Sequence, residues 1–146
     1  MKKASNPLDI RIFFVKKFKV KYDIKKFIKK IIESEKKHGA FINLIFVDDK
    51  KIKQINADFR FKNSETDVIS FTYNEKKYFG GDIFISVDTA RNNAKKYNVD
   101  FEEEIMRLVA HGVLHVLGYD HTNIFGKTEE MRKKQEKYVK KFLKEY

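Results

Sequence analysis

The sequence has no cysteine, a single proline at Pro7 and only six glycines. These shortages argue against a disulfide-bonded protein and against flexible linkers between domains. A chain without cysteine forms no disulfide and lacks the ligands that most often close a structural zinc site. With neither an internal repeat nor a linker-like tract, the 146 residues are expected to fold as one domain, residues 1–146. The apolar run at 12–15 is too short for a signal-peptide core or a membrane span. We therefore expect a cytoplasmic location and no membrane partner.

Charge is distributed unevenly along the chain, whose net charge is +11. Residues 1–40 carry +9 (13 basic and 4 acidic side chains) and residues 127–146 carry +4 (8 and 4), whereas residues 81–126 carry −3 (4 and 7). Basic ends and an acidic middle fit a protein that neutralises phosphates at its ends and holds a cation between them. Lysines outnumber arginines 27 to 5, however, and a lysine-rich proteome would produce the same excess. Charge alone leaves a nucleic-acid partner open.

Two stretches rich in isoleucine, phenylalanine and valine, residues 9–15 and 40–47, are typical of strands. Between them Asp23 can cap a helix whose inner face is formed by Ile24, Phe27, Ile28, Ile31 and Ile32. A strand–helix–strand unit of this kind predicts that the two strands are parallel. The lysines on the outer face of this helix form either a solvated surface or a track for RNA.

The middle of the chain predicts a short helix followed by a hairpin. The helix begins at Asp48 or Asp49 and delivers Arg60 at its end. Strands at 68–72 and 81–87 follow, joined by a polar turn that is short enough for antiparallel pairing.

Three further helices are expected after the hairpin. Asp88 can cap the first, which runs to about Tyr97, and Asp100 with Glu103 resembles the capping box that begins the second. The last starts near Thr128 and is expected to bury Met131, Gln135, Tyr138, Val139 and Phe142. These elements predict an α+β domain with about four strands and about five helices.

Three of the four histidines lie in one stretch of eleven residues, and their spacing indicates a zinc site with an open coordination position. His111 and His115 are four apart, so a helix places both imidazoles on one face. Gly118 can take the left-handed conformation that ends a helix, which would turn His121 back toward the other two. Three imidazoles and a water form a catalytic zinc site. The apolar residues of this helix form a buried stripe beside the histidines: Ile105, Leu108, Val109, Gly112, Val113 and Val116.

The spacing also matches the H-E-x-x-H-x-x-G-x-x-H motif of metalloproteases, except at one position. Gly112 stands where the protease has the glutamate that acts as general base. Zinc can still activate a water, but the protease route for proton transfer is missing. Peptidase activity is therefore disfavoured.

The stretch from His111 to His121, with Gly-Tyr-Asp-His at its end, resembles the signature of the YbeY family of endoribonucleases, or rRNA maturation factors. Two further segments are similar to the family in the same order: residues 56–60 with 66–71 (Asn-Ala-Asp-Phe-Arg and Thr-Asp-Val-Ile-Ser-Phe), and residues 81–86 (Gly-Asp-Ile-Phe-Ile-Ser). Glu65 and Thr72 stand where the family has prolines.

The resemblance implies a zincin-like fold with a mixed sheet and one zinc ion held by His111, His115 and His121, with other divalent transition metals as alternatives. It implies single-strand-specific endoribonuclease activity in rRNA processing, namely maturation of the 16S rRNA 3′ end, and in ribosome quality control. The implied partners are rRNA and the small ribosomal subunit, with ribosomal proteins and a ribosome-assembly GTPase.

Arg60 and His111 are the expected catalytic residues. A guanidinium contacts two phosphate oxygens together and stays protonated, so Arg60 is suited to neutralise charge on the phosphate. Its alternative is a surface ion pair with a neighbouring aspartate. Thr66, Asp67 and Ser70 are expected to bind substrate beside Arg60, or else to cap local backbone.

Two nearby carboxylates have open roles. Asp120 could orient an imidazole, serve as a base or bond backbone amides in a turn. Glu104 could support the site or stabilise the start of its helix.

The alternatives to the endoribonuclease are a non-catalytic ribosome- or RNA-binding module with a structural metal, and a metallopeptidase, which Gly112 disfavours. Removing zinc would separate the first two, because a catalyst would lose cleavage while keeping most of its RNA binding.

Overall fold

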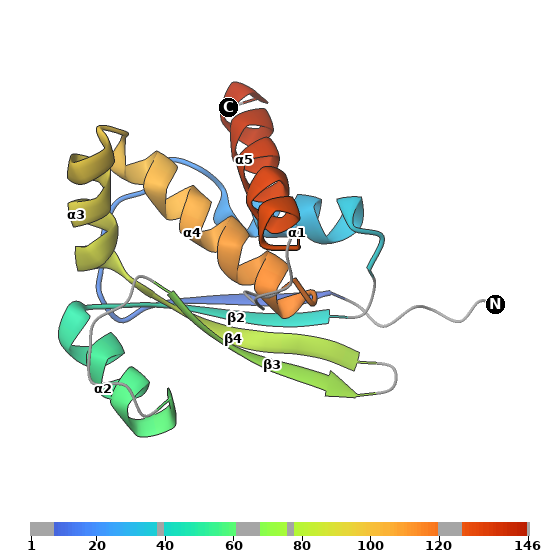
Figure 1. The fold of residues 1–146 in the computed structure, drawn as a ribbon, viewed down its shortest axis with the longest axis horizontal. Coiled ribbons are helices and arrows are strands. Elements are labelled where there is room, and N and C mark those ends of the chain that lie inside the picture. Colours follow the sequence, from blue (N-terminus) through green and yellow to red (C-terminus); the bar gives the residue numbers. More distant parts are fainter. Residues whose placement is uncertain (1–7, 38–39, 61–67, 76–77, 120–126, 146) are drawn as a thin grey trace.

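The computed structural model describes residues 8–37, 40–60, 68–75, 78–119 and 127–145. Along these residues the elements are β1 (Asp9–Phe14), α1 (Ile24–Ser34), β2 (Ala40–Val47), α2 (Asp49–Arg60), β3 (Val68–Glu75), β4 (Tyr78–Ser86), α3 (Val87–Tyr97), α4 (Phe101–Val116) and α5 (Lys127–Glu145). Helices α1, α3, α4 and α5 lie on one side of the sheet, and α2 lies on the other (Figure 1). The α+β class with four strands and five helices is as predicted. None of the described helices is both long and apolar enough to cross a membrane.

The strands form one mixed sheet in the order β1-β2-β4-β3. β1 and β2 are parallel and joined through α1, as the sequence predicts. β3 and β4 form the predicted antiparallel hairpin, but both strands are longer than expected, because Glu75 still pairs with Tyr78. Polar side chains had indicated an earlier turn. An edge strand with one solvated face accepts such side chains without losing its main-chain pairing.

The main core lies between the sheet and the layer formed by α1, α3, α4 and α5. All apolar positions predicted for α1 are buried, and so is the whole stripe predicted for α4. Of the five positions predicted to be buried on α5, Met131, Val139 and Phe142 are buried, whereas Gln135 and Tyr138 are half-buried. A second, smaller cluster packs α2 against the opposite face of the sheet through Val47, Ile52, Ile55 and Ile69.

Two of the predicted helix caps are formed by the expected residues. Asp23 accepts a hydrogen bond from the backbone N–H of Lys26 (3.1 Å) and begins α1. Asp48, rather than Asp49, caps α2 by accepting from the N–H of Lys51 (2.8 Å). Both contacts satisfy amides that have no partner inside the helix.

Neither of the two other predicted side-chain caps is formed, although Asp100 does occupy the N-cap position of α4. Ser86 caps α3 by accepting from the N–H of Thr89 (3.1 Å), while Asp88 accepts from the N–H of Asp49 (2.9 Å) at the start of α2. Asp88 is thus used by a helix 39 residues away in sequence. Asp100 precedes α4 but makes no side-chain cap, and Glu103 pairs with Arg107 instead. At the start of α3 a distant partner takes the predicted residue, whereas at the start of α4 Glu103 pairs with Arg107 within the same helix.

Candidate metal centre

Helix α4 rests directly on β4 at two points where no larger residue fits. A Cβ atom on Gly112 would lie 2.6 Å from Cγ2 of Ile83, and one on Gly81 would lie 2.9 Å from Cγ2 of Val116. Real Cβ atoms do not approach other atoms so closely. The helix is therefore held at a fixed height above the sheet, and position 112 points at the sheet.

His111 and His115 project from α4 as predicted, four residues apart and both half-buried. Nδ1 of His111 lies 2.9 Å from Oε1 of Gln135 on α5. An amide oxygen only accepts, so this contact is a hydrogen bond when Nδ1 carries the hydrogen, which leaves the lone pair of the neutral ring on Nε2. A neutral imidazole that donates through one nitrogen and offers a lone pair on the other is the form that binds zinc. His111 therefore fits the chemistry of a metal ligand, and His115 lies one turn further along the same helix.

Helix α4 ends in the turn that the sequence predicts. Gly118 has φ of +113°, its N–H donates to the carbonyl of His115 (3.1 Å), and the N–H of Tyr119 donates to the carbonyl of Leu114 (3.1 Å). This pair of bonds around a glycine with positive φ is a Schellman motif, which reverses the chain at a helix end. The chain is thus turned immediately before the segment that contains His121.

The third predicted ligand lies outside the described residues. The structure describes neither Asp120 nor His121. Among the residues that it does describe, no three histidine, cysteine, aspartate or glutamate side chains gather as a metal site would require. The ligand role of His121 and the role of Asp120 remain predictions.

The side chain of Glu35 joins the ends of α1 and α4 to the middle of α5 near this turn. Glu35 follows α1 and is only 8% exposed. It accepts hydrogen bonds from the hydroxyl of Tyr119 (2.9 Å), from Nζ of Lys134 (3.0 Å) and from the hydroxyl of Tyr138. Burial opposes its ionisation, but the hydrogen bonds from its three partners outweigh burial, so its pKa lies below the ordinary value. The Glu35 cluster therefore holds Tyr119 against α1 and α5.

A second group of charges joins α4 to α5 around Arg107. Its guanidinium donates to both carboxylate oxygens of Glu136 (2.8 and 3.1 Å), to Glu103 (2.8 Å) and to Glu104 (3.1 Å). Burial of Arg107 disfavours its charge, yet these hydrogen bonds raise its pKa above the ordinary value. Glu104 thus serves the α4–α5 interface through Arg107, and Asn93 of α3 also donates to it (3.4 Å).

The predicted substrate-binding residues are only partly within the described chain. Ser70 is half-buried and pairs with Ile83 in the β3–β4 ladder, so it lies on the sheet face that α4 covers. Thr66 and Asp67 lie outside the described residues, as does the side chain of Arg60. Helix α2, which ends at Arg60, packs on the opposite face. The structure therefore brings Ser70 to the histidine side and does not place the other three.

Sequence reasoning missed Gln135, Glu35 and Arg107 as neighbours of the candidate centre. Gln135 was assigned to the buried face of the last helix for its spacing alone. A polar residue among Met131, Val139 and Phe142 on that face was the available signal, because such a residue needs a hydrogen-bond partner. The sequence offered no comparable signal for Glu35 or Arg107.

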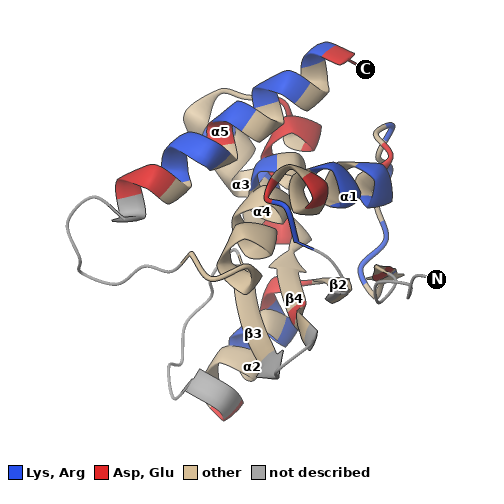
Figure 2. Cartoon of the chain, turned by 90° about the vertical axis from the view of Figure 1, so that its right-hand side faces the viewer, with Lys and Arg blue, Asp and Glu red and all other residues tan. Residues whose placement is uncertain are grey.

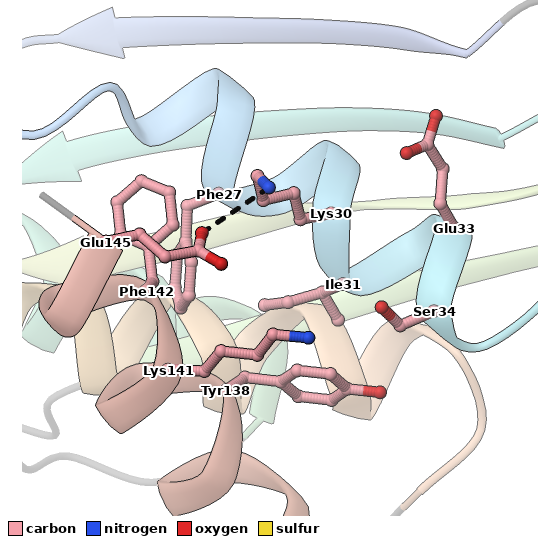
Figure 3. Close-up of a pocket in the computed structure, with 9 residues that line it drawn as sticks. All are labelled: Phe27, Lys30, Ile31, Glu33, Ser34, Tyr138, Lys141, Phe142 and Glu145. Carbon is pink, nitrogen blue, oxygen red and sulfur yellow. Dashed lines mark ion pairs between the residues drawn. The ribbon is translucent and has the colours of Figure 1, made fainter.

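A cavity of about 290 Å³ lies between α1 and α5, away from the predicted site residues. Figure 3 shows its apolar floor of Phe27, Ile31 and Phe142 and, at its rim, the ion pair between Lys30 and Glu145 (3.5 Å). Of the predicted site residues that the structure describes, none lines it. It is a gap between two packed helices and carries no catalytic group of the predicted kind.

Lysine and arginine occupy much of α1 and α5, where the ribbon is blue in Figure 2, alongside some acidic residues. The lysines that the sequence places on the outer face of the first helix, and on the turn after it, are all exposed: Lys25, Lys26, Lys29, Lys30, Lys36 and Lys37. Helix α5 adds further exposed lysines: Lys133, Lys137, Lys140, Lys141 and Lys144. Two segments far apart in sequence thus form the basic side of the helix layer.

Known proteins resemble this chain over most of its length. The family model described as endoribonuclease YbeY matches residues 11–143. Proteins named endoribonuclease YbeY are 41% identical over 112 residues in Flavobacterium johnsoniae (77% of this chain, 80% of the relative) and 44% over 101 residues in Nautilia profundicola (68% and 70%). The solution structure of a Thermotoga maritima protein matches with a TM-score of 0.67 at 31% identity, covering 93% of this chain and 90% of the other. The chain belongs to the YbeY family of endoribonucleases.

Proposed function

We propose that this protein is a zinc-dependent endoribonuclease that cleaves single-stranded RNA during rRNA processing. Membership of the endoribonuclease YbeY family carries the activity, because the match spans residues 11–143. The hydrogen bond from His111 to Gln135 supports the metal, because it leaves the lone pair on the ring nitrogen that a ligand uses.

Each predicted site residue has a role in this proposal. His111, His115 and His121 hold the metal. Zinc bound there would supply Lewis-acid chemistry and a water activated for attack on the phosphodiester. Arg60 neutralises charge that develops on the phosphate, through two parallel hydrogen bonds to its oxygens.

The remaining polar residues bind and orient the RNA. Ser70, on the sheet face beneath α4, contacts the substrate together with Thr66 and Asp67. The exposed lysines of α1 and α5 attract the phosphate backbone, so RNA affinity should fall steeply as salt is added.

The proposed substrate is rRNA of the small ribosomal subunit, with maturation of the 16S 3′ end and ribosome quality control as the processes served. Ribosomal proteins and a ribosome-assembly GTPase are the proposed protein partners. A cytoplasmic location is part of the same proposal, because bacterial ribosomes are assembled there.

Position 112 argues against a peptidase. The glutamate that a metalloprotease needs at this place would have its Cβ 2.6 Å from Ile83, so a glycine is required by the contact between α4 and β4. The side chain of a glutamate at position 112 would also leave the helix on the side that faces the sheet, not on the face that carries His111 and His115.

The test measures metal content and cleavage in the same preparation. Purified protein is assayed for bound metal, then incubated with a labelled 16S rRNA 3′ fragment and separately with unfolded casein, with and without a chelator. We expect one zinc per chain, RNA cleavage that the chelator abolishes, RNA binding that it leaves intact, and no proteolysis. Metal-independent binding without cleavage would favour the non-catalytic module, and metal-dependent proteolysis alone would overturn the proposal.

The role of Arg60 is tested by a substitution that keeps its charge. Arg60→Lys should reduce turnover while zinc content and melting temperature stay near those of the wild type, because lysine cannot make the two-point contact. Cleavage at the wild-type rate would exclude this role.

A further inference from the structure

Helices α4 and α5 are joined by a continuous chain of hydrogen bonds that ends on a predicted metal ligand. Arg107 and His111 lie one turn apart on α4 and face the adjacent residues Glu136 and Gln135 on α5. Glu136 receives two bonds from Arg107, and its Oε2 also accepts from Nε2 of Gln135 (3.1 Å). The other end of the Gln135 amide, Oε1, meets Nδ1 of His111 at 2.9 Å. We call these four residues the Gln135 relay.

The chemistry of each group allows the relay to run in one direction only. An arginine side chain donates and cannot accept, and an ionised carboxylate accepts and cannot donate. Glu136 is therefore able to meet the NH₂ end of the Gln135 amide but not its oxygen. A flipped amide would set two acceptors against each other at Glu136 and two donors, its NH₂ and an Nδ1–H, at His111.

The start of the relay is well anchored. The side chains of Arg107 and Glu136 are 20% and 27% exposed, and the guanidinium meets the carboxylate at two points. A bidentate pair of this kind has a fixed geometry, and partial burial protects it from screening by salt. The orientation of Glu136 is thus set before Gln135 is considered.

We propose that Gln135, oriented by Arg107 and Glu136, is a positioning residue that holds His111 in the tautomer with hydrogen on Nδ1 and so presents Nε2 to the metal. The inference rests on the zinc site of the proposed function. An unconstrained imidazole favours hydrogen on Nε2, which would block the nitrogen needed as a ligand. Hydrogen bonds to the second ring nitrogen also fix the ring's orientation.

Zinc affinity provides the first test. Zinc is titrated into metal-free protein in competition with a chromogenic chelator, for the wild type, Gln135→Leu and Tyr138→Phe. Gln135→Leu should weaken zinc binding about 10- to 100-fold, the usual effect of losing a partner of a ligating histidine. Tyr138→Phe is the matched control, because it removes a hydrogen bond from the same helix without touching His111, and its affinity should equal that of the wild type. Equal affinity of Gln135→Leu and wild type would overturn the proposal.

The tautomer itself provides the second test and needs no metal. Nitrogen-15 spectra of the metal-free wild type, at about pH 8.5 where an ordinary imidazole is neutral, should show hydrogen on Nδ1 of His111. Gln135→Leu should shift His111 toward hydrogen on Nε2, and Glu136→Gln should give a mixture, because an amide at 136 can face either end of Gln135. Hydrogen on Nε2 in the wild type would disprove the relay even if Gln135→Leu failed to fold. The expected tautomer in a protein that binds no zinc would instead refute the metal site and leave the relay standing.

Discussion

Glu136 and Glu35 each accept hydrogen bonds from several partners and tie α5 to a neighbouring helix, but the two clusters lead to different places. From Glu136 the bonds continue through Gln135 to His111, which is a predicted ligand. From Glu35 they reach Tyr119, Lys134 and Tyr138, none of which is a predicted site residue. Both carboxylates have a pKa below the ordinary value, because hydrogen bonds from their partners outweigh the effect of burial.

The comparison separates two uses of a partly buried carboxylate. In the Gln135 relay the hydrogen bonds select one tautomer of the His111 ring, so the loss of a bond should affect metal binding more than the stability of the fold. In the Glu35 cluster they tie the ends of α1 and α4 to the middle of α5, so a lost bond should affect the fold more than the metal. The two carboxylates are thus in similar electrostatic surroundings, but their loss should have different measurable consequences. The following variants test this contrast and the packing on which it depends.

The largest effect is expected where the relay ends. His111→Ala should abolish tight zinc binding and lower RNA cleavage by more than about 100-fold, beyond the effect typical of a ligand's hydrogen-bond partner. Adding Gln135→Leu to this variant should cause no further loss, because the two residues act on one interaction. Metal analysis and single-turnover cleavage measure both. A further loss in the double variant would show that Gln135 acts elsewhere.

Both clusters depend on the close packing of α4 against β4. Gly112→Ala should therefore destabilise the fold strongly. The new Cβ would meet Cγ2 of Ile83, a branched residue within the main core, at 2.6 Å. Overpacking of this kind costs about 1–3 kcal/mol of unfolding free energy, which urea titration measures. Gly118→Ala is the comparison, because among the described residues no atom beyond its two chain neighbours would lie within 4 Å of an added Cβ, and the cost comes from its φ of +113°. If Gly112→Ala were as stable as the wild type, α4 could not pack as closely against Ile83 as the structure shows.

The Glu35 side of the contrast is tested by Glu35→Gln. The amide keeps the shape but weakens the bonds from Lys134 and the two tyrosines, so the free energy of unfolding should fall by about 1–3 kcal/mol. Zinc affinity should change less than in Gln135→Leu. If Glu35→Gln lost zinc affinity but kept its stability, the assignment of the Glu35 cluster to the fold rather than to the metal would be wrong.

Acid should remove the same contribution from the wild type. The pKa of Glu35 is lower in the folded protein than in the unfolded chain, so its stabilisation is present at neutral pH. That stabilisation is lost as pH falls below about 4 and through the folded pKa, because the unfolded state binds the proton first. Unfolding free energies between about pH 6 and pH 3 should therefore fall less steeply in Glu35→Gln than in the wild type. Parallel curves would show that Glu35 does not titrate differently in the two states.

The smallest effect is expected at an exposed contact between α1 and α5, the ion pair of Lys30 with Glu145. Both side chains are about 40–45% exposed and 3.5 Å apart, so solvent screens them. Glu145→Gln should change the unfolding free energy by less than about 0.5 kcal/mol. A larger loss would mean that exposure is a poor guide to which α5 contact matters.

Much of the fold was predictable because its signals are local. The inner face of α1, the stripe of α4, the parallel pairing of β1 with β2 and the turn at Gly118 all follow from spacing within a few residues. The caps of α3 and α4 were not, because Asp88 bonds to the distant start of α2 and Glu103 pairs with Arg107 in the next turn of α4.

The sequence by itself determined the candidate ligands, since His111 and His115 share a helical face wherever that helix lies, and a glycine three residues later allows the chain to turn. Only the tertiary structure decided what surrounds them. Gln135 meets His111 across 24 residues of sequence, and Glu35 meets Tyr119 across 84, so neither pairing has a local pattern. The packing of α4 against β4 and α5 brings these groups together, and burial then makes each polar side chain bond to the partners within its reach.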